Sequence, residues 1–160
     1  MKQEAKHFDF LQGFREHQGA KGGFNLIRDD IPEGLKRVPG IYIIETTDRF
    51  KFPYPGGKSN ILYIGMSKDL DQRFREHRSA VQKIHNDPDY GIDDFVVVNT
   101  KYQYMARHGA RVYYYACRGA QDPKSMESWA LWNFYSVYRA QPVGNGARSF
   151  DVEPIEDQNL

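Results

Sequence analysis

The sequence predicts an α+β domain in which helices flank a small antiparallel central sheet. Three short runs of β-branched and aromatic residues, at 41–44, 61–64 and 111–117, predict three strands, and the sheet has room for more. Two segments with apolar residues at helical spacing, one after Asp69 and one over about 125–139, predict helices on that sheet. A chain of 160 residues with 40% hydrophobic residues is long enough to close one core around these elements.

The first two predicted strands are expected to pair as a hairpin. Residues 48–60, which lie between them, contain prolines and glycines close together and are predicted to form a loop. Residues 95–98 form a further strand-like run, Phe-Val-Val-Val, and the rest of 86–110 favours neither helix nor strand.

The first predicted helix has a recognisable start. Asp69 can cap it, and Gln72, three residues later, is the reciprocal half of a capping box. Its apolar residues at helical spacing are Leu70, Phe74, Val81 and Ile84. Pro142, Gly144 and Gly146 follow the final helix and are expected to end it.

Composition divides the chain into three parts. Residues 1–37 are polar and predict an irregular or partly helical N-terminal arm, residues 38–146 contain the predicted elements, and residues 147–160 form an acidic tail. The net charge is +1, and without the four tail acids the remainder has a basic excess of about +5. That excess is compatible with a nucleic-acid partner and does not by itself identify one.

Cysteine content and hydropathy favour a cytoplasmic protein. Cys117 is the only cysteine, so no intrachain disulfide can form, and we expect it to be a small core residue rather than a nucleophile. No apolar run is long enough to span a membrane, and the N-terminus lacks the apolar segment of a signal peptide.

Glu127 lies where packing alone would not place a carboxylate. With about 100° of rotation per residue, it falls in the middle of the apolar face of the final helix. That face is formed by Met126, Ala130, Leu131, Phe134 and Tyr138. A buried carboxylate is normally paired or bound to a metal. Glu127 is therefore either a functional ligand or one half of a structural ion pair.

Arg73 and His77 break the pattern of the earlier helix in a similar way. They are four residues apart, on or beside its apolar stripe. A guanidinium there is suited to gripping a phosphate, although an arginine extending from a helix edge to solvent is equally common. A histidine alone would more often be a hydrogen-bonded core residue. Together with Glu127, these residues predict a polar pocket in an otherwise apolar fold.

Two tripeptides connect these residues. Gly40-Ile41-Tyr42 lies on the first predicted strand and Tyr63-Ile64-Gly65 on the second. The segment from Tyr63 to His77 resembles the signature region of the GIY-YIG nuclease superfamily. Further along the chain, Glu127 and Asn145 are similar to the family's metal-binding glutamate and late asparagine. The resemblance covers about residues 38–146.

The resemblance implies a metal-assisted hydrolysis of phosphodiester bonds. Glu127 would hold one divalent ion, Mg²⁺ or Mn²⁺, against an oxygen of the scissile phosphate. Asn145 would brace the site by hydrogen bonds. Gly65 would allow close backbone approach at the strand end.

The same resemblance implies roles for the tyrosines. Tyr42 or Tyr63 would deprotonate or orient the attacking water, provided that the metal or Arg73 lowers the pKa of the phenol. Arg73 would stabilise charge on the phosphoryl oxygens, and His77 would relay a proton or hydrogen-bond a tyrosine. The sequence does not decide between the two tyrosines.

Further residues could contact the nucleic acid. Gly65, Ser67, Lys68, Arg75 and Arg78 are the candidates for binding the substrate backbone. Tyr102, Tyr104 and the tyrosines at 113–115 could stack on bases, but tyrosines alternating along a strand more often pack a sheet.

The expected function is a metal-dependent endonuclease that cuts DNA in restriction, repair, mobile-element or phage biology. The alternatives are an RNA-cleaving member of the same family and a non-catalytic nucleic-acid-binding module on the same fold. A small domain with little outside its core could dimerise on DNA to cut both strands.

Overall fold

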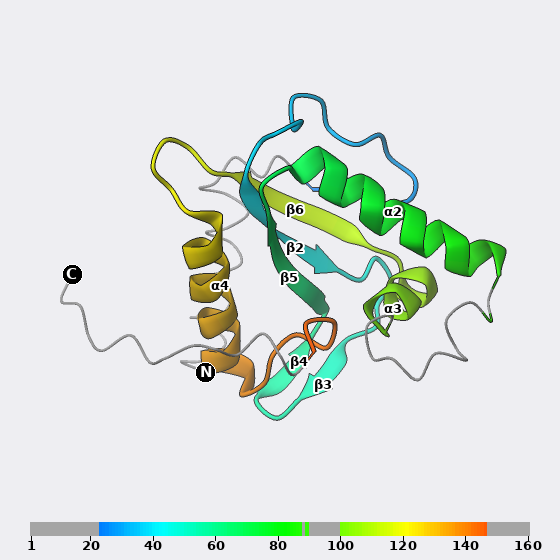
Figure 1. Cartoon of the computed structure of the whole chain (residues 1–160). Helices are drawn as coiled ribbons and strands as arrows, with labels where there is room; N and C mark the ends of the chain where they lie inside the picture. The colour runs from blue at the N-terminus through cyan, green and yellow to red at the C-terminus, as the bar shows by residue number, and fades with distance from the viewer. Residues whose placement is uncertain (1–22, 88, 90–99, 147–160) are drawn as a thin grey trace.

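The computed structural model describes residues 23–87, 89 and 100–146, and the structural statements below concern this part of the chain (Figure 1). The strands are β1 (Phe24–Asn25), β2 (Gly40–Glu45), β3 (Phe52–Tyr54), β4 (Gly57–Ser59), β5 (Ile61–Ser67) and β6 (Arg111–Ala116). The helices are α2 (Leu70–Asn86), α3 (Thr100–His108) and α4 (Pro123–Tyr138). The strand-like run at 95–98, the acidic tail and most of the N-terminal arm lie outside the described residues.

The main sheet is antiparallel, as the sequence predicts, and has four strands in the order β1-β6-β2-β5. The strand β2 pairs with both β5 and β6, so it is central, while β5 is at an edge. The register places Tyr42 between Gly65 on β5 and Tyr114 on β6. The GIY and YIG tripeptides are therefore direct neighbours across one pair of strands.

The predicted loop at 48–60 is wrong in its central part. This segment folds into a separate two-stranded hairpin, in which β3 pairs with β4 and Phe52 lies opposite Ser59. Phe52 is buried, with its ring 5.1 Å from that of Tyr104 on α3. Packing against a helix distant in sequence thus stabilises strands that the local proline and glycine content disfavours.

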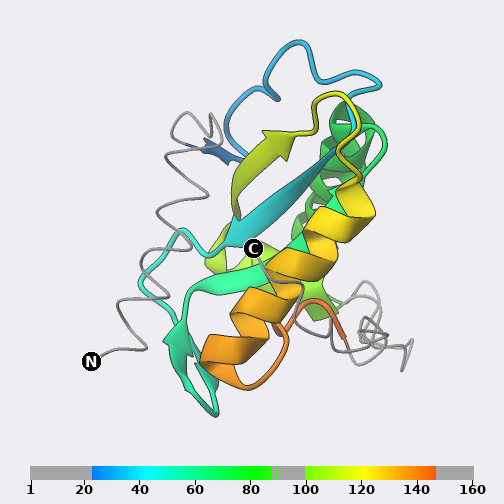
Figure 2. The same cartoon turned by 90° about the vertical axis from the view of Figure 1, so that its left-hand side faces the viewer.

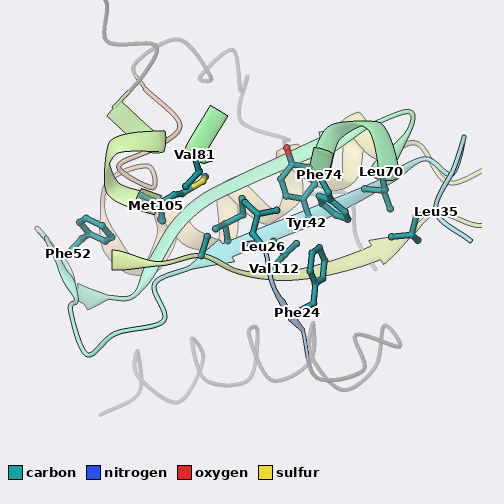
Figure 3. Packing of buried hydrophobic residues seen from close by; sticks show 13 residues of the cluster. Phe24, Leu26, Leu35, Tyr42, Phe52, Leu70, Phe74, Val81, Met105 and Val112 are labelled. Carbon is teal, nitrogen blue, oxygen red and sulfur yellow. The ribbon is translucent and has the colours of Figure 1, made fainter. Parts of the chain in front are cut away.

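Helices cover both faces of the main sheet. In Figures 1 and 2, α4 lies on one face, and α2 and α3 lie on the other. Side chains along β2 alternate between the two faces of the sheet. Tyr42 and Ile44 pack towards α2 and α3, while Ile41 and Ile43 pack towards α4. Figure 3 shows the first of these clusters, with Tyr42 beside Phe74. The buried face of β2 that carries Tyr42 is therefore the face covered by α2.

The helix starts agree in part with the predictions. Asp69 caps α2 and accepts a hydrogen bond from the Gln72 backbone N–H. The reciprocal half of the capping box is absent, because Ser67 Oγ accepts from the Asp69 N–H and the Gln72 side chain donates to Glu76. The helix α4 begins two residues before the predicted Ser125, because Asp122 caps it and proline occupies the first position.

Part of the predicted arm belongs to the core. The strand β1 joins the edge of β6, and Phe24, Leu26 and Leu35 are all buried. Burial of these apolar side chains ties residues 23–37 to the remainder of the fold. The domain boundary at residue 38 stays a prediction.

Candidate active site

The buried face between β2 and α2 contains a chain of hydrogen-bonded polar side chains. The Tyr42 hydroxyl lies 2.7 Å from His77 Nε2, and His77 Nδ1 lies 3.1 Å from the Tyr102 hydroxyl. Tyr42 and His77 are fully buried, and Tyr102 comes from α3. Three elements that are separate in sequence thus meet at one imidazole ring.

Tyr63 on β5 extends this chain towards the surface. Its ring centroid lies 5.9 Å from that of Tyr42, and the two hydroxyl groups are hydrogen-bonded. Tyr63 is partly exposed, whereas Tyr42 is not. Tyr63 is therefore the tyrosine of this pair that a solvent molecule can reach.

Gly65 leaves the space in which these two rings lie. A Cβ atom at this position would lie 2.5 Å from the Tyr63 ring and 2.9 Å from the Tyr42 ring and hydroxyl. Both distances are too short for any side chain without a shift of the tyrosines. The glycine thus permits close approach of the two rings to the strand.

Burial dominates the pKa values of the tyrosines. It raises the pKa of Tyr42 well above its ordinary value, and the neighbouring Tyr63 adds to this while Arg73 opposes it. Burial also raises the pKa of Tyr63, the Glu127 carboxylate raises it further, and the Tyr42 hydrogen bond and Arg73 lower it. Arg73 lowers the pKa of both phenols, which is the direction that the resemblance implies, but without metal or nucleic acid burial outweighs the guanidinium.

The chain of polar contacts therefore links four elements. Tyr102 on α3 contacts His77 on α2, and His77 contacts Tyr42 on β2. Tyr42 in turn lies beside Tyr63 on β5.

His77 is neutral across the physiological range of pH. Burial, together with the nearby Lys101 and Arg73 cations, lowers the pKa of His77 to about 3. A neutral imidazole donates at one ring nitrogen and accepts at the other, as this chain of bonds requires. His77 is therefore a hydrogen-bond partner of the tyrosines in the resting protein.

Two cations lie beside the tyrosines. Arg73 on α2 is 42% exposed at its side chain, and its Nη1 lies 3.1 Å from Glu76 Oε2. Lys101 on α3 places Nζ 4.5 Å from the centre of the Tyr63 ring and 5.0 Å from that of Tyr102. Arg73 lowers the pKa of Lys101, as does burial, which is the larger effect.

Glu127 approaches the same point from α4, on the other side of β5. It is half-buried rather than central to the buried stripe of α4, and it hydrogen-bonds with the Met66 backbone. Burial raises the pKa of Glu127, while the Met66 bond, Lys124 and Arg73 lower it. Within the described residues the ion pairs do not include Glu127, so nothing here supports a structural salt bridge.

The described residues contain no cluster of three or more histidine, cysteine or acidic side chains that could hold a metal. Glu127 would be the single carboxylate ligand. One half-buried carboxylate fits Mg²⁺ or Mn²⁺, because Mg²⁺ keeps several waters and takes other ligands from substrate phosphates. The residues present thus fit one divalent ion shared with a phosphate.

Asn145 holds the backbone of β5. Its Oδ1 accepts from the Ile64 N–H at 3.0 Å, and its Nδ2 donates to the Ile64 carbonyl at 2.6 Å. The preceding Gly144 N–H donates to the Leu62 carbonyl at 2.8 Å. This residue therefore fixes the strand on which Tyr63 and Gly65 lie, from a position far along the chain.

The other residues predicted to contact the substrate differ in whether their side chains can reach a ligand. Lys68 and Arg73 line a surface groove of about 340 Å³ between the end of β5 and the start of α2. Ser67 is buried and exchanges hydrogen bonds with the Asp69 backbone, so it is part of the helix cap. Lys68 is thus placed to reach a ligand, whereas the Ser67 hydroxyl is already used.

The two remaining arginines are engaged with the protein. Arg75 is exposed and paired with Asp71, with Nε 2.8 Å from the carboxylate. Arg78 donates to the backbone carbonyls of Leu26 and Asp29, which ties α2 to the segment after β1. Arg78 therefore has a structural partner that the sequence pattern did not indicate.

Sequence reasoning missed Lys101 and, as a member of the site, Tyr102. The only local signal was their place next to each other in a segment to which the sequence assigned no element. By contrast, the tyrosines of β6 pack the sheet as expected: Tyr113 and Tyr115 lie against one core cluster and Tyr114 against the other. Cys117 is partly buried beside Met126, and burial raises the pKa of its thiol.

The fold and the site define a class: a small antiparallel α+β domain with two tyrosines on adjacent strands, an arginine and a histidine on the following helix, and a glutamate on a later one. Residues 38–116 match the family model of the GIY-YIG catalytic domain. Residues 38–116 of this chain are therefore a catalytic domain of the GIY-YIG nuclease superfamily. The matched residues end with β6, so Glu127 and Asn145 lie beyond them.

Comparison with curated proteins and with solved structures gave no match. In the described part of the chain, no helix is both long enough and apolar enough to cross a membrane.

Proposed function

We propose that this chain is an endonuclease that hydrolyses phosphodiester bonds in DNA with the help of one divalent ion. The observation that carries the proposal is the half-buried Glu127 carboxylate, which lacks an ion-pair partner among the described residues. It is close enough to Tyr63 to raise the pKa of that phenol, and Arg73 in turn acts on Glu127. A carboxylate, a guanidinium and a hydroxyl around one point suit a cation and a phosphodiester.

In this proposal the two tyrosines have different tasks. Tyr63, which solvent can reach, orients the attacking water and accepts its proton in the phenolate form. Tyr42, which is fully buried, donates a hydrogen bond to Tyr63 and stabilises that phenolate. His77 holds Tyr42 in this orientation through its own bond at 2.7 Å.

Arg73 and Glu127 act on the phosphate. Arg73 stabilises the charge that develops on the phosphoryl oxygens. Glu127 would hold the divalent ion, which when bound polarises a phosphate oxygen and offsets the carboxylate charge that raises the pKa of Tyr63. Asn145 keeps the Tyr63 strand in place through its two bonds to Ile64.

The test is cleavage of supercoiled plasmid with and without Mg²⁺ or Mn²⁺, using the full chain. We expect metal-dependent nicking or linearisation, and a loss of about 100-fold or more in Glu127→Gln. Glu33→Gln removes an exposed carboxylate from the loop after β1 and should cleave like the native chain. Full activity in Glu127→Gln, or equal activity with a chelator, would refute the metal role.

A comparison of Tyr63→Phe with Tyr42→Phe tests the division of labour. Loss of the Tyr63 hydroxyl should nearly abolish cleavage, while loss of the Tyr42 hydroxyl should reduce it less and also lower stability, because His77 loses a buried partner. Near-native cleavage by both variants would exclude a tyrosine base.

Substrate competition decides between DNA and RNA. Cleavage of RNA in preference to DNA would identify the RNA-cutting alternative, and metal-independent binding without cleavage would identify a binding module. Light scattering with DNA present measures the proposed homodimer: a persistent monomer that breaks both strands in one event would argue against it.

A further inference from the structure

Lys101 is a cation whose position the mechanism above leaves unexplained. Its side chain is half-buried, and Nζ lies over the faces of the Tyr63 and Tyr102 rings at 4.5 and 5.0 Å from their centres. Tyr63 is on β5 and Tyr102 is on α3, so the ammonium group spans the junction of the two elements. It therefore lies over the tyrosine to which the proposed function assigns the attacking water.

Among the described residues, this ammonium group forms no ion pair with a carboxylate. The charged group that acts on it most is another cation, Arg73. Burying a cation is costly unless an anion pairs with it, and contact with aromatic faces offsets only part of that cost. Arg73 is paired with Glu76, whereas Lys101 has aromatic faces but no carboxylate partner among the described residues, so Lys101 is able to bind an anion.

The surroundings limit what that anion can be. Lys101 on α3 and Arg73 on α2 both lower the pKa of His77, so two cations from different elements act on the same buried group. An anion that binds both cations would lie near Tyr63, because Lys101 lies over its ring and Arg73 lowers its pKa. A phosphodiester oxygen fits this place, because two cations from different elements can hold two oxygens of one phosphate.

We propose that Lys101 is a substrate-binding residue that holds the scissile phosphate opposite Arg73. The inference rests on the proposed nuclease function, which it deepens by adding a second cation at the reacting phosphate. In the absence of nucleic acid, Lys101 lowers stability, because it is half-buried beside another cation. The charge of Lys101 contributes a favourable interaction only when the phosphate binds.

The experiment measures binding without cleavage. Lys101→Met is introduced into the Glu127→Gln chain, and binding to a labelled DNA duplex is measured by fluorescence anisotropy over a range of salt concentrations. Lys58→Met, which removes an exposed lysine from β4, is the matched control, and Lys101→Arg tests rescue by charge. Melting temperatures of all four chains are measured without DNA.

We expect Lys101→Met to weaken binding by about tenfold to 100-fold, as for loss of a charge-assisted bond. The slope of log K against log salt should fall by about one, corresponding to one phosphate contact fewer. Its melting temperature should equal or exceed that of the parent chain, whereas a packing role would lower it. Lys101→Arg should bind nearly as well as the parent, and Lys58→Met should match it.

Three results would overturn the proposal: unchanged affinity and slope in Lys101→Met, an equal loss in Lys58→Met, or a marked drop in the melting temperature of Lys101→Met. Failure of the nuclease proposal is recognised separately. A native chain that binds DNA but never cleaves it refutes the proposed catalysis, and the Lys101 proposal is then still decided by the three results above. A native chain that binds no nucleic acid refutes both proposals.

Discussion

Replacement of His77 by glutamine should remove a defined part of the pH dependence of stability. The folded chain holds the pKa of His77 at about 3, against a reference value of about 6.5 for an unfolded histidine. Between these values the unfolded chain binds a proton that the folded chain does not, so the free energy of unfolding decreases as pH falls. The contribution is complete above about pH 6.5 and is lost progressively towards pH 3.

The magnitude follows from the same two pKa values. Between pH 7 and pH 5 the folded histidine stays neutral while the unfolded one becomes almost fully charged. Linkage then gives a loss of about 2 kcal/mol over this interval. Glutamine at position 77 can still hydrogen-bond with Tyr42 and Tyr102 but does not titrate. Between pH 7 and pH 5, the free energy of unfolding of His77→Gln should therefore fall by about 2 kcal/mol less than that of the native chain.

Urea unfolding followed by circular dichroism at pH 7 and pH 5 measures this difference. The raised pKa of Glu127 acts in the opposite direction, but it is common to both chains and cancels in the comparison. His85, which is exposed near the end of the same helix, is the matched control. His85→Gln should show the same difference in free energy of unfolding between pH 7 and pH 5 as the native chain. A His77→Gln chain that loses as much stability as the native chain would refute the buried neutral imidazole.

Three further substitutions test other contacts. Gly65→Ala places a Cβ 2.5 Å from a tyrosine ring, so thermal melting should report a loss of about 1–3 kcal/mol and plasmid assays a loss of cleavage; native behaviour in both would contradict the close approach. Asn145→Ala frees the Ile64 N–H and carbonyl, and hydrogen exchange at Ile64 should accelerate by about tenfold or more; unchanged exchange would contradict the brace. Arg78→Met should lower the urea midpoint while leaving DNA affinity unchanged, and the reverse result would restore Arg78 as a phosphate contact.

The sequence predicted the elements whose side chains alternate against a core. The runs at β2, β5 and β6, and the apolar stripes of α2 and α4, carry their own periodicity, so local pattern was sufficient. It also located His77 and the unusual Glu127, because a polar residue on an apolar face is visible without knowledge of its partner.

The sequence did not predict contacts whose partners are distant. The strands β3 and β4 depend on Phe52 packing against Tyr104, and the hydrogen bond of His77 to Tyr102 joins α2 to α3 across a segment with no clear pattern. In the sequence, Arg78 could not be distinguished from the other basic residues of α2, because its partners, the carbonyls of Leu26 and Asp29, are distant along the chain. Periodicity identifies the face on which a residue lies, and it does not identify what meets that face.

The hydrogen bonds of Asn145 and Gly144 also occupy part of the open edge of the main sheet. Because β5 is an edge strand, the Leu62 carbonyl and both backbone groups of Ile64 would otherwise be open to pairing with a strand of another molecule. The segment after α4 occupies these groups and stops such a strand from adding to the sheet. Loss of this segment would therefore expose an aggregation-prone edge in the same step that releases the strand carrying Tyr63.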